Sequence, residues 1–154
     1  MNDIRSGQAV PDFSVASTGG TFRLSEQRGQ HLVLFFYPRA NTPGCTQEAQ
    51  DFRDLAPDFA KANTSIVGIS RDTLSAQTRF KEKLQLPFEL LADPDEQICQ
   101  LFDVMRERTM YGRKVMSIER STFLIDGNGI LRQEWRKVRV ANHAATVLEA
   151  CRKL

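Results

Sequence analysis

The chain has 154 residues, of which 41% are hydrophobic and 26% charged, so it is long enough to form one domain spanning residues 1–154. Its net charge of +2 is too small to favour nucleic acid or an anionic membrane as a partner. The longest apolar run, residues 32–37, is far shorter than the ~20 residues of a membrane-spanning helix. Because residues 1–7 also lack the apolar core of a signal peptide, we expect a cytoplasmic protein.

The first half of the chain predicts alternating strands and helices. Two short strand candidates, residues 13–17 and 21–24, flank a Thr-Gly-Gly hairpin turn at residues 18–20. The apolar residues 31–37 predict a buried strand. The elements expected next are a helix from residue 46 to about 61, which Pro57 ends or kinks, a buried strand over 65–70 and an amphipathic helix over 73–84.

The second half predicts one more helix and then a terminal hairpin and helix. A short strand over 88–91 precedes a helix over 94–102, with Asp93 as its N-cap and Pro94 at its first position. Residues 106–118 are basic and predict an irregular segment. The elements expected after it are a strand over 120–125, an Asp-Gly-Asn-Gly turn, a partner strand over 130–138 and a last helix from Asn142 to Leu154.

This order of elements predicts a thioredoxin-like α/β fold. Strands that alternate with helices favour a central mixed sheet with helices on both faces, and the last hairpin supplies an antiparallel pair. The N-terminal hairpin is an extension of that fold, and the helix over 94–102 is an insertion into it.

Cysteines and histidines are few, which restricts the possible chemistry. Cys45, Cys99 and Cys151 form an odd and sparse set that is not a secreted disulfide framework. The sequence has no CxxC pair, and His31 and His143 lack HExxH spacing. We therefore expect neither a metal site nor a cofactor.

Cys45 has the most informative setting of the three. It follows the predicted strand over 31–37 and a Pro-Arg-Ala-Asn-Thr-Pro-Gly loop, and it directly precedes a predicted helix. A sulfur at a helix N-terminus lies near unpaired N–H groups and the positive end of the helix dipole, which favour the reactive thiolate.

The neighbours of Cys45 suit a reactive thiol. The hydroxyl of Thr42 can face the sulfur across the turn, Pro38 stiffens the loop, and Gly44 lets a small ligand approach the backbone. A thiolate also needs a cation, and Arg120 is the best candidate because it starts a strand expected beside the first buried strand.

These groups would bind one small, oxygen-rich molecule, and a peroxide fits. Attack of the thiolate on one peroxide oxygen develops charge on the other, which preorganised donors stabilise. The cysteine becomes a sulfenic acid.

The sequence resembles the peroxiredoxins. Pro38, Thr42 and Cys45 match the PxxxTxxC signature of that family, and the wider match is to its peroxiredoxin Q group, also called bacterioferritin comigratory proteins. The segments that carry the resemblance are residues 7–13, 36–38, 42–48, 110–114, 120–126 and 135–138, together with His143 and the helix behind it.

The resemblance implies a thiol peroxidase that reduces hydrogen peroxide and organic hydroperoxides. It makes Cys45 the peroxidatic cysteine, with Thr42 and Arg120 binding peroxide and activating the thiolate. Pro38 would shield the sulfur, and Glu48 would orient local groups.

The chain departs from that group in its second cysteine. Many members carry a resolving cysteine five residues after the first, where this chain has Gln50, and others carry one in the next helix, here residues 73–84 without cysteine. We therefore predict that an external thiol, from thioredoxin, glutaredoxin with glutathione or a similar carrier, reduces the sulfenic acid. Cys99 is the remaining resolving candidate, after local unfolding, ahead of Cys151.

Two other functions compete with the peroxidase. A thiol-disulfide oxidoreductase would need a second active-site cysteine, and a redox sensor or holdase would use oxidation of Cys45 as a signal. The basic residues of the 106–118 segment either form a solvated loop or dock an acidic reductant. We expect His143 to serve as a structural hydrogen-bonding residue and the protein to be a monomer.

Overall fold

The computed structural model describes residues 4–154. Residues 1–3, which begin the stretch expected to lack a signal peptide, lie outside the described residues. The elements in chain order are β1 (Ser14–Ser17), β2 (Gly20–Arg23), the 3₁₀-helix η1 (Leu24–Gln27), β3 (His31–Phe36), α1 (Pro43–Lys61), β4 (Thr64–Ser70), α2 (Leu74–Leu84), β5 (Glu89–Ala92), α3 (Gln97–Leu101), β6 (Met105–Met110), β7 (Arg113–Ile118), β8 (Ser121–Ile125), β9 (Leu131–Trp135) and α4 (His143–Arg152).

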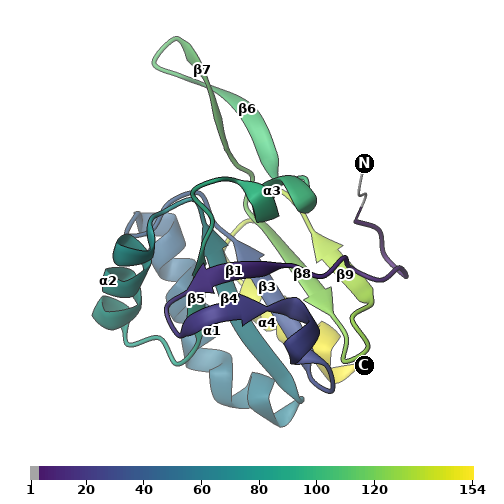
Figure 1. Ribbon diagram of the computed structural model, residues 1–154. Coiled ribbons are helices and arrows are strands. Elements are labelled where there is room, and N and C mark those ends of the chain that lie inside the picture. Colours follow the sequence, from purple (N-terminus) through teal and green to yellow (C-terminus); the bar gives the residue numbers. More distant parts are fainter. Residues whose placement is uncertain (1–3) are drawn as a thin grey trace.

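A seven-stranded mixed sheet forms the centre of the molecule (Figure 1). Its strand order is β2-β1-β5-β4-β3-β8-β9. The strands β3, β4 and β5 run parallel, whereas β8 pairs antiparallel with β3 and β1 pairs antiparallel with β5. The structure confirms the predicted thioredoxin-like fold, with its N-terminal hairpin extension.

The sheet separates two hydrophobic cores. Along β3, Val33 and Phe35 belong to the core that α1, α2 and α4 cover, and Leu34 and Phe36 belong to the core that contains α3. This period-two alternation follows from the geometry of a strand buried on both faces. The run of apolar residues therefore supplies both cores at once.

The basic segment over 106–118 is a regular hairpin, which corrects the expected irregular segment. Strands β6 and β7 pair from Met105 opposite Ile118 to Met110 opposite Arg113. Tyr111 and Gly112 form the two-residue turn and both have positive φ, as a hairpin turn that matches strand twist requires. The hairpin forms a sheet of its own and projects from the body of the molecule (Figure 1).

Two helix starts also differ from the prediction. Helix α3 begins at Gln97 rather than at residue 94, because Glu96 adopts a left-handed φ of 62° that no helix can continue through. The Asp93 carboxylate nevertheless accepts the N–H groups of Ile98 and Cys99, at 3.2 and 2.8 Å. Helix α1 begins at Pro43, three residues before the predicted start, and continues past Pro57 to Lys61.

Among residues 4–154, none of the helices combines the length and hydropathy needed to span a membrane.

Candidate active site

Cys45 lies in the first turn of α1, beyond the carboxyl end of β3. Thr42 is the N-cap residue and Pro43 opens the helix, so Cys45 is its third residue. Proline suits this position because its missing N–H would have no partner in the first turn. The helix thus begins with its unpaired N–H groups and positive dipole end around the sulfur.

Arg120 reaches the sulfur from the neighbouring strand. It directly precedes β8, whose Ser121 pairs with Phe36 at the end of β3. Its Nη2 donates to Sγ of Cys45 at 3.5 Å, and its Nη1 donates to Oε1 of Glu48 at 2.7 Å. One guanidinium therefore connects the thiol and a carboxyl one turn further along the same helix.

Glu48 is buried, with only 1% of its side chain exposed. Burial raises its pKa to about 7, although the charge and hydrogen bond of Arg120 act in the opposite direction. Its Oε2 has no hydrogen-bond partner among residues 4–154. For Arg120, burial acts to lower the pKa, but the neighbouring Glu48 and Cys45 together raise it, so the guanidinium stays charged.

The loop before the helix holds the other predicted site residues. The hydroxyl of Thr42 donates to the carbonyl of Arg39 at 2.8 Å, and within residues 4–154 no hydrogen bond joins it to the sulfur. Gly44 lies against the guanidinium, since a Cβ there would be 3.2 Å from Nη2 of Arg120. Only glycine, which has no Cβ, leaves the space beside the guanidinium free.

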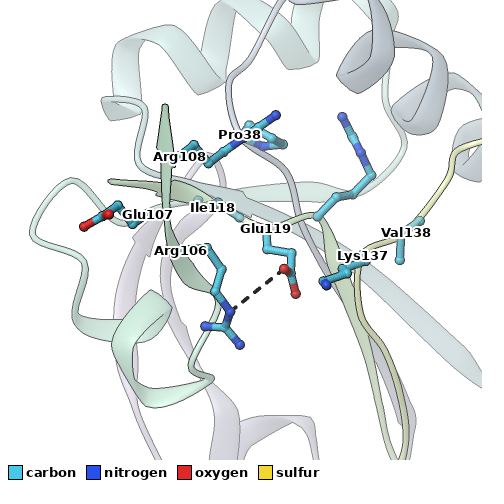
Figure 2. Close-up of a pocket in the computed structure, with 9 residues that line it drawn as sticks. Pro38, Arg106, Glu107, Arg108, Ile118, Glu119, Lys137 and Val138 are labelled. Atoms are coloured by element: carbon cyan, nitrogen blue, oxygen red, sulfur yellow. Dashed lines mark ion pairs between the residues drawn. The ribbon is translucent and has the colours of Figure 1, made fainter. Parts of the chain in front are cut away.

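A groove of about 670 Å³ adjoins the site. Pro38 and Arg120 line one part of it, and the base of the β6–β7 hairpin and the segment after β9 line the rest (Figure 2). Cys45 itself is 1% exposed and is not part of the groove lining, which reaches as far as its neighbour Arg120. The arrangement presents a buried sulfur, a charged donor and an adjoining groove, which suits attack on a small polar molecule.

Comparison with known proteins decides the family. Residues 6–134 match the AhpC/TSA family. The chain belongs to this family. Peroxiredoxin Bcp of Bacillus subtilis is 44% identical over 152 residues, which cover 98% of this chain and 97% of that protein. Peroxiredoxin Bcp of Escherichia coli K12 is 37% identical over 96% of both chains.

Solved structures agree with these relatives. Peroxiredoxin Q of Xanthomonas campestris superposes with a TM-score of 0.87 at 44% identity, covering 92% of this chain and 90% of that one. A PrxQ mutant of Xylella fastidiosa superposes with a TM-score of 0.92 at 36% identity, covering 97% and 96%. The chain is therefore a peroxiredoxin, a thiol-dependent peroxidase, and the resemblance of its sequence to the peroxiredoxin Q group is confirmed.

The other two cysteines of this peroxiredoxin are also buried, and neither forms a disulfide with Cys45. Cys99 belongs to the core on the opposite face of the sheet, and burial, reinforced by the Asp93 carboxylate, raises its pKa well above the ordinary value. Cys151 shares a core with Cys45 but contacts Thr64, at the start of β4, and burial raises its pKa to about 11. Both thiols are held protonated at neutral pH.

His143 lies next to the site of this peroxiredoxin and is held there by a hydrogen bond and two ring contacts. Its Nε2 is 2.8 Å from the hydroxyl of Thr122, and its ring meets Phe52 and Trp135 edge-on. Burial lowers its pKa to about 4, and the charge of Arg120 adds to that effect. The imidazole is therefore neutral at physiological pH.

Sequence reasoning named Pro38 and Arg120 and considered the basic 106–118 residues as a dock for an acidic reductant, but it did not place them in one groove. Besides Arg120, the cations of the groove come from β6 and from the segment after β9, far apart in the chain, and include Arg108 and Lys137. The basic composition of residues 106–118 was the available signal. Among the described residues, no three side chains of His, Cys, Asp or Glu gather in a way that could hold a metal ion.

Proposed function

We propose that this peroxiredoxin reduces hydrogen peroxide and organic hydroperoxides through a sulfenic acid on Cys45, which an external thiol then reduces. The observation that supports this most is the guanidinium of Arg120, which donates to both Sγ of Cys45 and Oε1 of Glu48. A structure of the Xanthomonas campestris relative is described in terms of alkyl peroxide reduction activity.

Arg120 has two roles in this proposal. One of its nitrogens donates a hydrogen bond to the sulfur of Cys45, and its donors stabilise the negative charge that develops on the peroxide as the O–O bond breaks. Sγ forms a bond to one peroxide oxygen, and the other oxygen leaves as hydroxide or alkoxide and takes up a proton. Cys45 becomes a sulfenic acid, the first and reversible step of thiol oxidation.

Glu48 fixes the direction of the guanidinium. The planar guanidinium has little freedom when one of its nitrogens is held by a buried carboxyl at 2.7 Å. The second nitrogen then points to the sulfur. Glu48 is a positioning residue in this scheme because its oxygen meets Arg120 and not the sulfur.

The loop residues shape the approach of the peroxide. Pro38 lines the groove together with Arg120, where its rigid ring limits the access of water to the site. Gly44 leaves room beside the guanidinium for the peroxide. Thr42 holds the loop through Arg39, and its hydroxyl oxygen keeps lone pairs that can accept the proton of a hydroperoxide.

The external thiol follows from the positions of the cysteines. Gln50 stands five residues after Cys45, and α2 (Leu74–Leu84) contains no cysteine. Cys99 and Cys151 are both buried in the core and held protonated. Thioredoxin, glutaredoxin or glutathione are the classes of reductant that would supply the thiol.

One experiment tests both halves of the proposal. The reduced protein is mixed with one equivalent of hydrogen peroxide, thiol loss is followed by stopped flow, and the product is treated with dimedone and analysed by intact mass. We expect rapid loss of one thiol and a dimedone adduct on Cys45. An internal disulfide, seen as the loss of two hydrogens without an adduct, would refute the external thiol, and a rate no faster than that of free cysteine would refute the peroxidase site.

That the enzyme works as a monomer in the cytoplasm stays a prediction. Sedimentation of the reduced and oxidised protein tests the first part of it.

A further inference from the structure

The groove beside Cys45 carries two cations that have no partner in the described part of the chain. Its acidic residues are both engaged, Glu119 with Arg106 at 3.9 Å and Glu107 with Lys114 at 3.8 Å. Within residues 4–154, Arg108 and Lys137 form no ion pair and no hydrogen bond through their side chains. Unpaired cations in a concave surface attract anions, because the walls reduce screening by solvent.

These two cations come from different walls of the groove. Figure 2 shows Arg108 on β6, near Pro38, and Lys137 beside Val138 in the segment that follows β9. A ligand with two separated negative groups can therefore contact both walls. A volume of about 670 Å³ lies in the range of small-molecule sites.

The groove also reaches the residue that contacts the reactive sulfur. Pro38 and Arg120 line it, and Arg120 is the residue whose Nη2 lies 3.5 Å from Sγ of Cys45. A molecule anchored on the two cations would place its other end at the guanidinium. Hydrogen peroxide is uncharged and too small to need such an anchor, so the groove suits a second, larger reactant.

We propose that this groove binds the carboxylates of a small anionic thiol, such as a short acidic peptide thiol, which reduces oxidised Cys45. The inference rests on the external-thiol step of the proposed function and names the class of thiol. It requires that the thiol be small, since Cys45 is only 1% exposed.

The chemistry balances with two molecules of thiol. The first thiolate attacks the sulfur of the sulfenic acid, an S–S bond forms, and the S–O bond breaks to release hydroxide, which takes a proton to become water. A second thiolate attacks the sulfur of the bound thiol, which releases the Cys45 thiolate and a small disulfide. The thiol is oxidised by two electrons in total, and the sulfenic acid is reduced by two.

The test compares two thiols that differ in their carboxylates, and two double variants that each lose two cations. Glutathione, with two carboxylates, is compared with its diethyl ester, which has the same thiol and neither carboxylate. The variant Arg108→Met/Lys137→Met removes both groove cations. The matched control Arg23→Met/Lys153→Met removes two exposed cations elsewhere and changes the net charge equally. Each protein is oxidised with one equivalent of hydrogen peroxide, and its reduction is followed by stopped flow.

We expect the groove variant to react about tenfold more slowly with glutathione at low ionic strength, and within twofold of wild type with the diethyl ester. High salt should remove most of the difference, because it screens exposed charges. The control variant should match wild type with both probes. An equal loss with the ester, or no loss with glutathione, would overturn the proposal.

A further experiment distinguishes whether the groove binds the reducing thiol or an anionic peroxide substrate. Oxidation of Cys45 by a carboxylate-bearing alkyl hydroperoxide is compared with oxidation by tert-butyl hydroperoxide in the same variants. We expect the groove variant to leave the ratio of these rates unchanged. A selective loss with the carboxylate-bearing peroxide, without loss in the glutathione step, would assign the groove to the substrate and refute the reductant. Failure of hydrogen peroxide to oxidise wild-type Cys45 would instead refute the proposed function itself.

Discussion

The guanidinium of Arg120 lies 3.5 Å from the sulfur of Cys45, although 75 residues separate the two in the chain. Strand pairing produces this contact. β8 runs antiparallel beside β3, so the residue before β8 meets the segment that leaves β3 for α1. The site is therefore assembled by two inner strands of the sheet, β3 and β8, each of which is hydrogen-bonded to a neighbouring strand on both sides.

Replacing Arg120 should slow the oxidation of Cys45 far more than it changes the fold. Arg120→Met removes a charged donor to the developing oxyanion, which is worth about 3 kcal/mol, or roughly a hundredfold in rate. The measurement is the second-order rate constant with hydrogen peroxide by stopped flow. The double variant Arg120→Met/Glu48→Gln avoids leaving a buried carboxyl without its cation and should be equally slow.

Arg152→Met is the control for that experiment, because the one ion pair of Arg152 within residues 4–154 is with Glu149, and both side chains are exposed. It should react like wild type. If Arg120→Met stayed within threefold of wild type, Arg120 would have no place in the chemistry.

Glu48 and His143 should give opposing contributions to the pH dependence of stability. The pKa of Glu48 is raised from 4.5 to about 7, so the folded protein binds its proton more tightly and this group lowers stability as pH rises through that window. The pKa of His143 is lowered from 6.5 to about 4, so this group raises stability as pH rises from 4 to 6.5. Between pH 4.5 and 6.5 the two slopes oppose each other.

Urea unfolding at several pH values between 4.5 and 6.5 separates these contributions. In Glu48→Gln the free energy of unfolding should rise with pH more steeply than in wild type, by up to about 1.4 kcal/mol per pH unit. In His143→Gln it should rise less steeply, or fall. Parallel profiles for the three proteins would show that neither group titrates there.

Removing the two buried thiols should leave the peroxidase intact. Cys99→Ala/Cys151→Ala deletes one sulfur from each core and should lower stability by about 1–2 kcal/mol per site through lost packing. Turnover with hydrogen peroxide and an external thiol should stay within twofold of wild type. Loss of turnover in a variant that remains folded at the assay temperature would assign a redox role to one of these thiols.

Gly68 should tolerate no side chain, because it lies under an aromatic ring. It pairs with Phe35 across β3 and β4, and a Cβ would come within 2.8 Å of the ring and 2.9 Å of the Leu90 side chain. Gly68→Ala should cost about 1–3 kcal/mol of stability by overpacking. Adding Phe35→Leu should make room, so the double variant should be less destabilised than the sum of the single variants. Additive costs would argue against the clash.

The sequence was most informative where one signal dominated. Local sequence predicts three parts of the structure: the apolar run that forms β3, the loop up to Cys45 and the turn after β8. Arg120 could be placed beside Cys45 because its strand was expected next to the buried strand that precedes Cys45. The pairing partner of a buried strand is restricted by topology, so this long-range contact was within reach of sequence reasoning.

The β6–β7 hairpin was out of reach for a physical reason. Most of its side chains are exposed on both faces, so the strands lack the alternation that indicates a half-buried strand. Its turn uses a tyrosine at positive φ, which composition does not predict. The groove could not be predicted either, because Arg108 reaches it only once the hairpin has formed. The hydroxyl direction of Thr42 likewise depends on the carbonyl of Arg39 rather than on spacing alone.

The sheet divides the molecule into two cores, and each core contains a buried cysteine whose labelling can report when that core opens. Cys99 lies in one core and Cys151 in the other, and both are shut off from solvent in the folded protein. A thiol-labelling reagent can therefore reach either one only when its own layer opens. Labelling rates at the two positions, followed by mass spectrometry, would time the opening of the two layers independently, without any engineered cysteine.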